Sequence, residues 1–251
     1  MISKAKIKLI QSLKNKKYRI KNGLFVVEGK KSILDLLYAG MKAVHIFSLN
    51  NLIDDFSEAD CLVDEVSYTD IKKISLLSTP SNSLAIFKIP EYDIDATYKD
   101  NFLLALDNVQ DPGNFGTIIR TADWFGIKHI VCSLNTVDVF NPKVVQASMG
   151  SIARVRVYYL DLFDYLKSAQ DKFTLYGSFM EGKSIYKTSF QEKKILIMGN
   201  EGNGISPEIK NLINEKVSIP IFTTGNSAPE SLNVAMASGI IISEIKRKSK
   251  D

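Results

Sequence analysis

Arg120 is a residue whose type and position suggest chemistry. Only five of the 32 basic residues are arginines, so a position that needs positive charge alone would more often hold lysine. A guanidinium offers a rigid, permanently charged fork that suits phosphate or carboxylate. Arg120 follows Gly116 by four residues, which places both on one side of a helix. It is a candidate for binding an anionic group, and an ion pair with Glu201 or an aspartate is the alternative.

Three loops rich in glycine and polar residues follow predicted strands. They are DNVQDPGNFG at 107–116, GNEGNG at 199–204, and the segment after IPI at 219–221. Ligands of parallel sheets bind beyond the carboxyl ends of the strands. One such loop would be an ordinary turn, but three indicate a composite ligand site. No GxxxxGK[ST] occurs, and no GxGxxG with an acid after the next strand, which disfavours the common nucleotide, dinucleotide and Rossmann-type methyltransferase sites.

The stretch SAPESLNVAMASG at 227–239 predicts a helix that contains one unusual polar residue. From Leu232 to Ile242 the helix is nearly apolar on every side, which is typical of a buried helix. A buried Asn233 would need hydrogen-bond partners. Ser227 and Glu230 fit a capping box, and this cap leaves Asn233 without an explanation. We therefore expect Asn233 to face inward, beyond the cap.

The elements that would position these residues form an α/β unit followed by a larger one. In the larger one, apolar runs at 102–108, 129–134, 174–179, 194–199 and 216–221 are separated by helical segments. Such runs indicate strands covered on both faces, and hence a mainly parallel sheet. The smaller one has predicted strands at 25–29, 43–49, 62–66 and 84–89, helices at 3–14, 30–40 and 68–77, and a basic turn at 14–23. Residues 90–100 are acidic and aperiodic, as in a linker.

Positive charge is concentrated at the beginning of the chain. The first 31 residues hold ten lysines or arginines and one acid, Glu28, although the net charge of the whole chain is only +4. Such a segment favours a polyanion, because neutralised phosphates release counterions; a solvated lysine-rich face is the alternative. Cys61 and Cys132 lie in no metal-binding pattern, so we expect no metal, no disulfide and a reducing cytoplasm. No apolar run is long enough for a membrane span.

Three segments together resemble a known family. DNVQDPGNFGTIIRTADWFG, IMGNEGNGIS and IPIFTTGNSAPESLNVAMASG are similar, in order and spacing, to the three motifs of the SpoU (TrmH-type) branch of the SPOUT RNA methyltransferases. The N-terminal part looks like the ribosomal-protein-L30e-like substrate-binding domain of that branch. The resemblance implies an α/β fold with this domain at 1–95 and a catalytic domain at 100–251, which has a mainly parallel sheet and a C-terminal deep trefoil knot.

The same resemblance implies the reaction. It implies S-adenosylmethionine as cofactor, a homodimer formed through the catalytic domain, and methyl transfer to a ribose 2′-hydroxyl of structured RNA. Ribosomal RNA is the expected substrate because of the L30e-like domain, and transfer RNA is the alternative. A non-catalytic RNA-binding protein of the same fold is disfavoured, because Arg120, Glu201 and Asn233 are all present. An oxidoreductase is disfavoured by the missing dinucleotide fingerprint.

The resemblance also implies residue roles. Arg120 would hold the target phosphate and ribose oxygen, Glu201 would orient Arg120 or Asn114, and the pair Ser231 and Asn233 would lie beside methyl donor and substrate. The expected catalytic residues are Arg120, Asn114, Glu201, Ser231 and Asn233, and the expected cofactor-binding residues are Met198, Gly199, Asn200, Gly204, Ile219, Ile221, Ser231 and Leu232. The expected RNA-binding residues are Lys14, Lys16, Lys17, Arg19 and Lys30. The loop at 222–230 is slightly longer than the branch leads us to expect.

Overall fold

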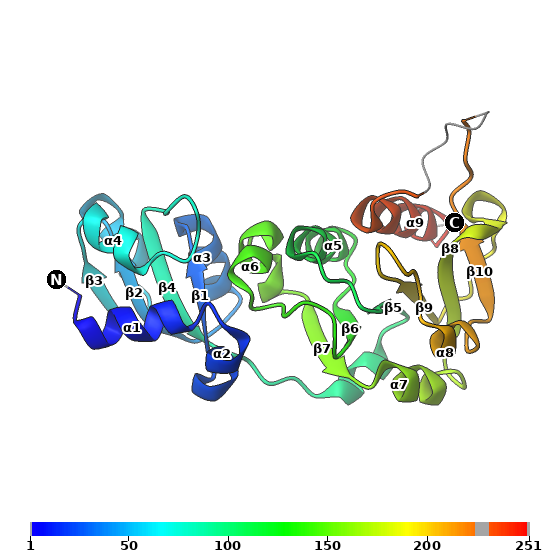
Figure 1. Cartoon of the computed structure of the whole chain (residues 1–251), viewed down its shortest axis with the longest axis horizontal. Helices are drawn as coiled ribbons and strands as arrows, with labels where there is room; N and C mark the ends of the chain where they lie inside the picture. Colours follow the sequence, from blue (N-terminus) through cyan, green and yellow to red (C-terminus); the bar gives the residue numbers. More distant parts are fainter. Residues whose placement is uncertain (1, 224–230, 250–251) are drawn as a thin grey trace. The chain divides into compact units, whose positions relative to one another are not determined.

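The computed structural model describes residues 2–223 and 231–249 (Figure 1). The chain divides into two compact units. The first consists of residues 1–91 and 138–154, and the second of residues 92–137 and 155–251. The domain limits expected from the sequence, 1–95 and 100–251, stay a prediction. By its contacts, the segment 138–154 belongs to the first unit although it lies between two strands of the second.

The first unit is built on a mixed four-stranded sheet of order β1-β4-β2-β3. The β2–β3 pair is parallel and the other two pairs are antiparallel. Apolar side chains of α1 and α4 pack against this sheet in one core. The elements are α1 (Lys4–Ser12), α2 (Lys16–Asn22), β1 (Leu24–Glu28), α3 (Lys30–Tyr38), β2 (Ala43–Ser48), η1 (Asn50–Phe56), β3 (Leu62–Glu65), α4 (Tyr68–Ile74), β4 (Ser83–Lys88), α6 (Pro142–Ser148) and η3 (Ser151–Ala153).

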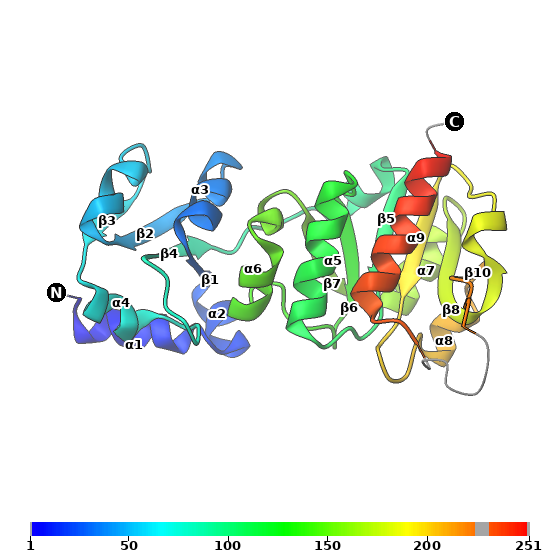
Figure 2. The ribbon, with the colours of Figure 1, turned by 90° about the horizontal axis from the view of Figure 1, so that it is seen from above.

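The second unit is built on a six-stranded sheet of order β10-β8-β9-β5-β6-β7, in which every pair is parallel. Helices α5 and α9 lie side by side on one face, and α7 and α8 cover the other (Figures 1 and 2). The elements are η2 (Ile94–Lys99), β5 (Phe102–Leu106), α5 (Pro112–Trp124), β6 (His129–Ser133), β7 (Arg156–Leu160), α7 (Leu162–Ala169), β8 (Thr174–Ser184), η4 (Ile185–Lys187), β9 (Lys194–Met198), α8 (Pro207–Lys210), β10 (Glu215–Ser218) and α9 (Val234–Lys248).

The α/β fold with a mainly parallel sheet is confirmed. The two central strands, β5 and β9, are buried at every residue, because helices cover both faces of the sheet. That burial is why their sequences are continuous apolar runs rather than alternating ones. The apolar runs at 129–134 and 174–179 also correspond to strands, β6 and β8.

Two local expectations from the sequence are wrong. Residues predicted as a basic turn contain the helix α2, which ends at Gly23 in a left-handed conformation with φ of 62°. Residues predicted as a linker contain the 3-10 helix η2, whose first turn is capped by the Asp93 side chain. Ile94 and Tyr98 from this segment pack against the core of the second unit. Aperiodic sequence therefore does not mean an unpacked segment here.

Candidate active site

The strand order of the second unit creates a topological switch point. From β5 the chain proceeds to β6 and then β7 on one side, whereas β9, β8 and β10 lie on the other side of β5. Connections from β5 and β9 therefore leave in opposite directions, and a crevice forms between their carboxyl ends. The loops at 107–111 and 199–206 occupy this position.

The loop after β5 places Asn114 in the first turn of α5. Asp111 is the N-cap residue, and its Oδ1 accepts a hydrogen bond of 2.7 Å from the backbone N–H of Asn114. Pro112 occupies the first helical position, where its missing N–H costs nothing. This local sequence, Asp-Pro-Gly-Asn, thus starts the helix and presents the Asn114 side chain at its amino end.

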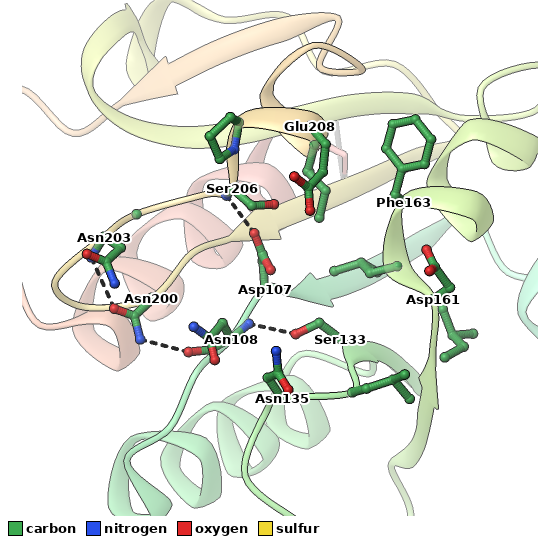
Figure 3. A pocket seen from close by; sticks show the side chains of 16 residues that line it. Asp107, Asn108, Ser133, Asn135, Asp161, Phe163, Asn200, Asn203, Ser206 and Glu208 are labelled. Atoms are coloured by element: carbon green, nitrogen blue, oxygen red, sulfur yellow. Dashed lines mark hydrogen bonds between the residues drawn. The ribbon is translucent and has the colours of Figure 1, made fainter.

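The loop after β9 is a tight hairpin that carries Glu201. Backbone hydrogen bonds of 3.0 and 2.9 Å join Asn200 and Gly204 in both directions. Gly199 packs so closely on this turn that a Cβ would lie 2.3 Å from the carbonyl carbon of Gly204. The Asn200 side chain accepts from the N–H of Gly202 and Asn203, and it donates to the Asn108 carbonyl oxygen at 2.8 Å (Figure 3). The hairpin is therefore fixed both internally and to the loop after β5.

Asn233 begins the helix α9. Its Oδ1 accepts from the backbone N–H groups of Ala235 at 3.0 Å and Met236 at 3.3 Å, as expected of an N-cap residue. The expectation that Asn233 is buried and lies beyond the cap is wrong. Asn233 is exposed, and it is itself the N-cap residue of α9. The capping box at Ser227 and Glu230, and the longer loop at 222–230 from residue 224 onward, lie outside the described residues.

Asn233, Asn114 and Glu201 form one hydrogen-bonded chain, which we call the amide chain. Asn233 Nδ2 donates to Asn114 Oδ1 at 2.8 Å, and Asn114 Nδ2 donates to Glu201 Oε1 at 2.9 Å. Both ends fix its direction. At one end, the N–H groups of the helix need an acceptor, so Asn233 turns its Oδ1 toward them and its NH₂ toward Asn114. At the other end, the Glu201 carboxylate can only accept, so Asn114 turns its NH₂ toward Glu201. Three segments distant in sequence are thereby joined in one defined orientation.

Arg120 lies on α5 and is exposed. Within residues 2–223 and 231–249, no ion pair or hydrogen bond joins it to another side chain. Of the two partners expected for Glu201, the structure supplies Asn114 and not Arg120. The guanidinium therefore keeps its donors for a ligand, as an anion-binding role requires.

The expected cofactor residues lie at the carboxyl ends of β9 and β10 and just before α9. Met198 is the last residue of β9, Ile219 and Ile221 follow β10, and Ser231 and Leu232 immediately precede Asn233. Ile221 and Leu232 expose large apolar side chains, at 55% and 48%. Half-exposed apolar side chains of this kind fit the flat ring of a ligand such as S-adenosylmethionine.

The basic segment contains one residue that does not fit its expected role. Arg19 is only 2% exposed; its guanidinium donates to the Asp138 carboxylate and to the carbonyl oxygens of Leu13 and Lys14. It stabilises the packing of α2 within the first unit and is not available to RNA. Lys14, Lys16 and Lys17, which we call the turn lysines, are exposed. Lys30 forms an ion pair of 2.7 Å with Asp55.

Two residues of the site were missed by the sequence analysis. Asp107 directly follows β5, and its carboxylate is buried. Its Oδ2 accepts a 2.7 Å hydrogen bond from the Ser206 N–H. Asn108 has a positive φ of 60° and receives the Asn200 side chain on its carbonyl oxygen. The position of Asp107, an acid directly after an apolar strand, is a signal that the sequence shows. The left-handed backbone of Asn108 leaves no such signal in the sequence.

Neither a metal-ligand cluster nor a membrane-spanning helix occurs in the part of the chain that is described. Within it, no group of three or more His, Cys, Asp or Glu side chains is arranged to hold a metal ion. None of the described helices is both long enough and apolar enough to cross a membrane. What the site offers is a cation, a carboxylate and oriented amides.

Family models and several known proteins match most of this chain. Residues 101–243 match the SpoU rRNA Methylase family, and residues 4–85 match the MRM3-like substrate binding domain. The Bacillus subtilis 23S rRNA (guanosine(2553)-2′-O)-methyltransferase RlmP is 28% identical, with 96% of each chain covered. A TrmH-family structure from Porphyromonas gingivalis is 39% identical with a TM-score of 0.87, covering 99% of both chains. The AdoMet-bound rRNA methyltransferase of Sinorhizobium meliloti is 28% identical with a TM-score of 0.87, covering 98% of this chain and 97% of that one.

Proposed function

The chain belongs to the SpoU rRNA methylase family, and on this premise we propose that it transfers a methyl group from S-adenosylmethionine to a ribose 2′-hydroxyl of ribosomal RNA. The amide chain carries this proposal, because it joins residues of all three family motifs at the switch point of the sheet. The relative that spans 96% of this chain is named as a 23S rRNA 2′-O-methyltransferase, which favours ribosomal over transfer RNA.

Residues after β9 and β10 would hold the cofactor. Backbone groups near Gly199 and Ile219, with the apolar side chains of Ile221 and Leu232, would surround the adenosine part. When bound, S-adenosylmethionine supplies an electrophilic methyl group whose leaving group is a neutral thioether. The protein therefore has no leaving group to protonate, and catalysis reduces to positioning the hydroxyl and stabilising the negative charge that develops on its oxygen.

Arg120 and the amide chain would perform these tasks. The exposed guanidinium of Arg120 would bind the phosphate next to the target ribose and stabilise the developing alkoxide. A guanidinium is permanently protonated and cannot accept a further proton, so Arg120 would act through its charge, and a substrate phosphate oxygen would take the proton of the hydroxyl. Asn233 and Ser231 would lie beside the ribose, and Glu201 would keep the Asn114 amide in its orientation.

The first unit would contribute to RNA binding. It matches a substrate-binding domain over residues 4–85, and the turn lysines are exposed. Lysines that neutralise phosphates supply affinity without sequence preference, so this unit would contribute binding strength. Lys30 would contribute only by exchanging Asp55 for a phosphate, since it is already paired.

The assembly and topology implied by the resemblance are also part of the proposal. Trp124 on α5 and Met236 on α9 are 84% and 61% exposed, and their helices lie side by side. Large apolar side chains exposed on two neighbouring helices are one mark of an association surface, which supports a homodimer through the catalytic domain. We further infer a C-terminal trefoil knot and a cytoplasmic location; both free cysteines, Cys61 and Cys132, agree with a reducing compartment.

Mapping of ribose methylations tests the substrate. RNA from cells that lack this gene is compared with RNA from the parent strain and from the strain complemented with the Arg120→Ala variant. We expect one ribose methylation in the ribosomal RNA to be lost in the deletion and not restored by the variant. Loss of a transfer RNA methylation instead, with ribosomal RNA unchanged, would reject the proposed substrate.

A further inference from the structure

The crevice at the switch point of the second unit contains a cavity most of whose lining residues have no role in the proposed reaction. It has a volume of about 630 Å³ and is lined by residues after the carboxyl ends of β5, β6, β7 and β9 (Figure 3). Of the eight expected cofactor positions, only Asn200 and Gly204 contribute to its wall. Ile219 and Ile221 follow β10, which is at the opposite edge of the sheet from β7. The cavity and the cofactor residues therefore lie mainly on different sides of the hairpin at 199–204.

The wall of this cavity selects against anions. Its charged side chains are those of Asp107, Asp161 and Glu208, and none of the described residues that line it is a lysine or arginine. A phosphate or carboxylate placed there would face three acids without a counter-charge. Phe163 and neighbouring leucines supply apolar surface. A wall of this kind fits a neutral ligand that has a flat face and N–H donors.

Asp107 gives the strongest reason to expect such donors. It is only 6% exposed, and a buried carboxylate is costly unless donors surround it. Its Oδ2 accepts from the Ser206 N–H, whereas no described residue donates to its Oδ1. Figure 3 shows the carboxylate directed into the cavity.

The Ser206 hydroxyl beside it is a second, independent sign. Ser206 Oγ is buried and has no hydrogen-bond partner among the described residues, and Ser206 lines the same cavity. Buried polar atoms in native proteins are nearly always paired. Two polar groups at one cavity wall thus have unused hydrogen-bonding capacity.

We propose that this cavity binds a nucleobase that is splayed out of the RNA substrate, and that Asp107 reads the N–H donors of guanine. The proposal rests on the proposed function, since it assumes an RNA substrate. Guanine presents adjacent N1–H and N2–H donors, which match the two-oxygen edge of a carboxylate, whereas uracil offers one ring N–H. Proteins that read RNA sequence do so mostly on unstacked bases, which stack on aromatic side chains such as Phe163.

The test uses the full-length protein and free guanosine, up to its solubility limit, as the probe. Backbone amide signals of residues 107–108, 133–135, 203–206 and 208 are followed by NMR during titration. Inosine lacks the N2 amine, 1-methylguanosine lacks the N1–H, and uridine presents one donor. We expect guanosine to shift these signals and to bind more tightly than all three, because each absent donor removes a charge-assisted hydrogen bond worth roughly tenfold in affinity.

Two variants and a control locate the binding. Asp107→Asn keeps an acceptor for the Ser206 N–H and loses the charge, so guanosine affinity should fall roughly tenfold or more. Phe163→Ala, at a half-buried position, should weaken all the nucleosides alike. Asp171→Asn, at an exposed residue that does not line the cavity, should change nothing. Thermal unfolding of each variant separates a loss of binding from a loss of fold.

Several results would overturn the inference. These are the absence of any shift in the named signals, equal binding of guanosine and uridine, and guanosine affinity unchanged in Asp107→Asn. Displacement of guanosine by S-adenosylmethionine would also overturn it, because the cavity would then belong to the cofactor. Calorimetry with S-adenosylmethionine on the same samples distinguishes this failure from that of the proposed function: cofactor binding without guanosine binding rejects only the base pocket.

Discussion

The double role of Asn233 gives a prediction that separates helix capping from catalysis. Its Oδ1 caps α9, and its Nδ2 holds Asn114. Asn233→Ala removes both functions. Asn233→Ser keeps a hydroxyl that can accept from the N–H groups of the first turn, yet it has no NH₂ to reach Asn114. The two variants should therefore agree in activity and differ in stability.

The magnitudes follow from these contacts. Loss of an N-cap side chain costs about 0.5–2 kcal/mol, and loss of a neutral hydrogen bond costs about 0.5–1.5 kcal/mol. Asn233 is exposed and Asn114 half-buried, so values near the lower ends apply. We expect Asn233→Ala to lose about 1–2 kcal/mol, a fall in Tm of roughly 2–8 °C for a chain of this size. Asn233→Ser should lose less than about 1 kcal/mol, since it keeps the cap.

Activity should fall similarly in both variants. Without Asn233 the Asn114 amide has no donor on Oδ1 and is free to rotate away from Glu201. If this misorientation raises the activation free energy of methyl transfer by about 1.4 kcal/mol, the rate falls roughly tenfold. The assays are thermal unfolding by circular dichroism and kcat for methyl transfer at saturating S-adenosylmethionine.

A capping residue remote from the site serves as the control. Ser67 caps α4 by accepting from the Asp70 N–H, so Ser67→Ala should lower stability and leave kcat unchanged. Wild-type kcat in Asn233→Ser would refute the reasoning, because the link to Asn114 would then have no role in turnover. So would equal stability losses in the serine and alanine variants.

Three further predictions concern other residues. Arg120→Ala should reduce methyl transfer by a factor of about 100 or more, as expected for loss of charge stabilisation, while calorimetry shows unchanged cofactor affinity; a large loss of that affinity would reject its catalytic role. Replacing the turn lysines with glutamine should flatten the slope of log K for RNA binding against log salt by roughly two units, and an unchanged slope would make them a merely solvated face. Burial lowers the pKa of His45 below 6.5, so the unfolded chain binds a proton there more readily, and the stability of the first unit should fall as the pH drops below about 6.5. His45→Gln should remove that part of the pH dependence in urea titrations, and an unaltered pH profile would contradict it.

The sequence predicted the fold well where burial leaves a continuous pattern. The runs that became β5 and β9 are apolar at every position because helices cover both faces. The meeting of the loops that carry Asn114 and Glu201 was expected from the composite ligand site, whereas the pairing of these two side chains, 87 positions apart, was expected only through the resemblance. No periodicity in a single sequence carries that information.

Three details depend on tertiary structure and could not be predicted. Arg19 looked like part of a basic surface, yet its partner Asp138 lies 119 residues away in the chain. Asn233 looked like a buried residue because the helix that follows it is apolar. Which residue becomes the N-cap depends on the backbone conformation of the segment that leads into the helix. The cavity beside Asp107 arises from the order of the strands, which local sequence does not encode.

Transfer of a labelled methyl group tests the central claim most directly. The purified protein is incubated with ribosomal RNA and methyl-labelled S-adenosylmethionine, and the labelled nucleosides are then identified after digestion. We predict that the label is found in one 2′-O-methylated nucleoside with the wild-type protein and is absent with Arg120→Ala. Label on a base, or cofactor binding without transfer to either ribosomal or transfer RNA, would contradict the account.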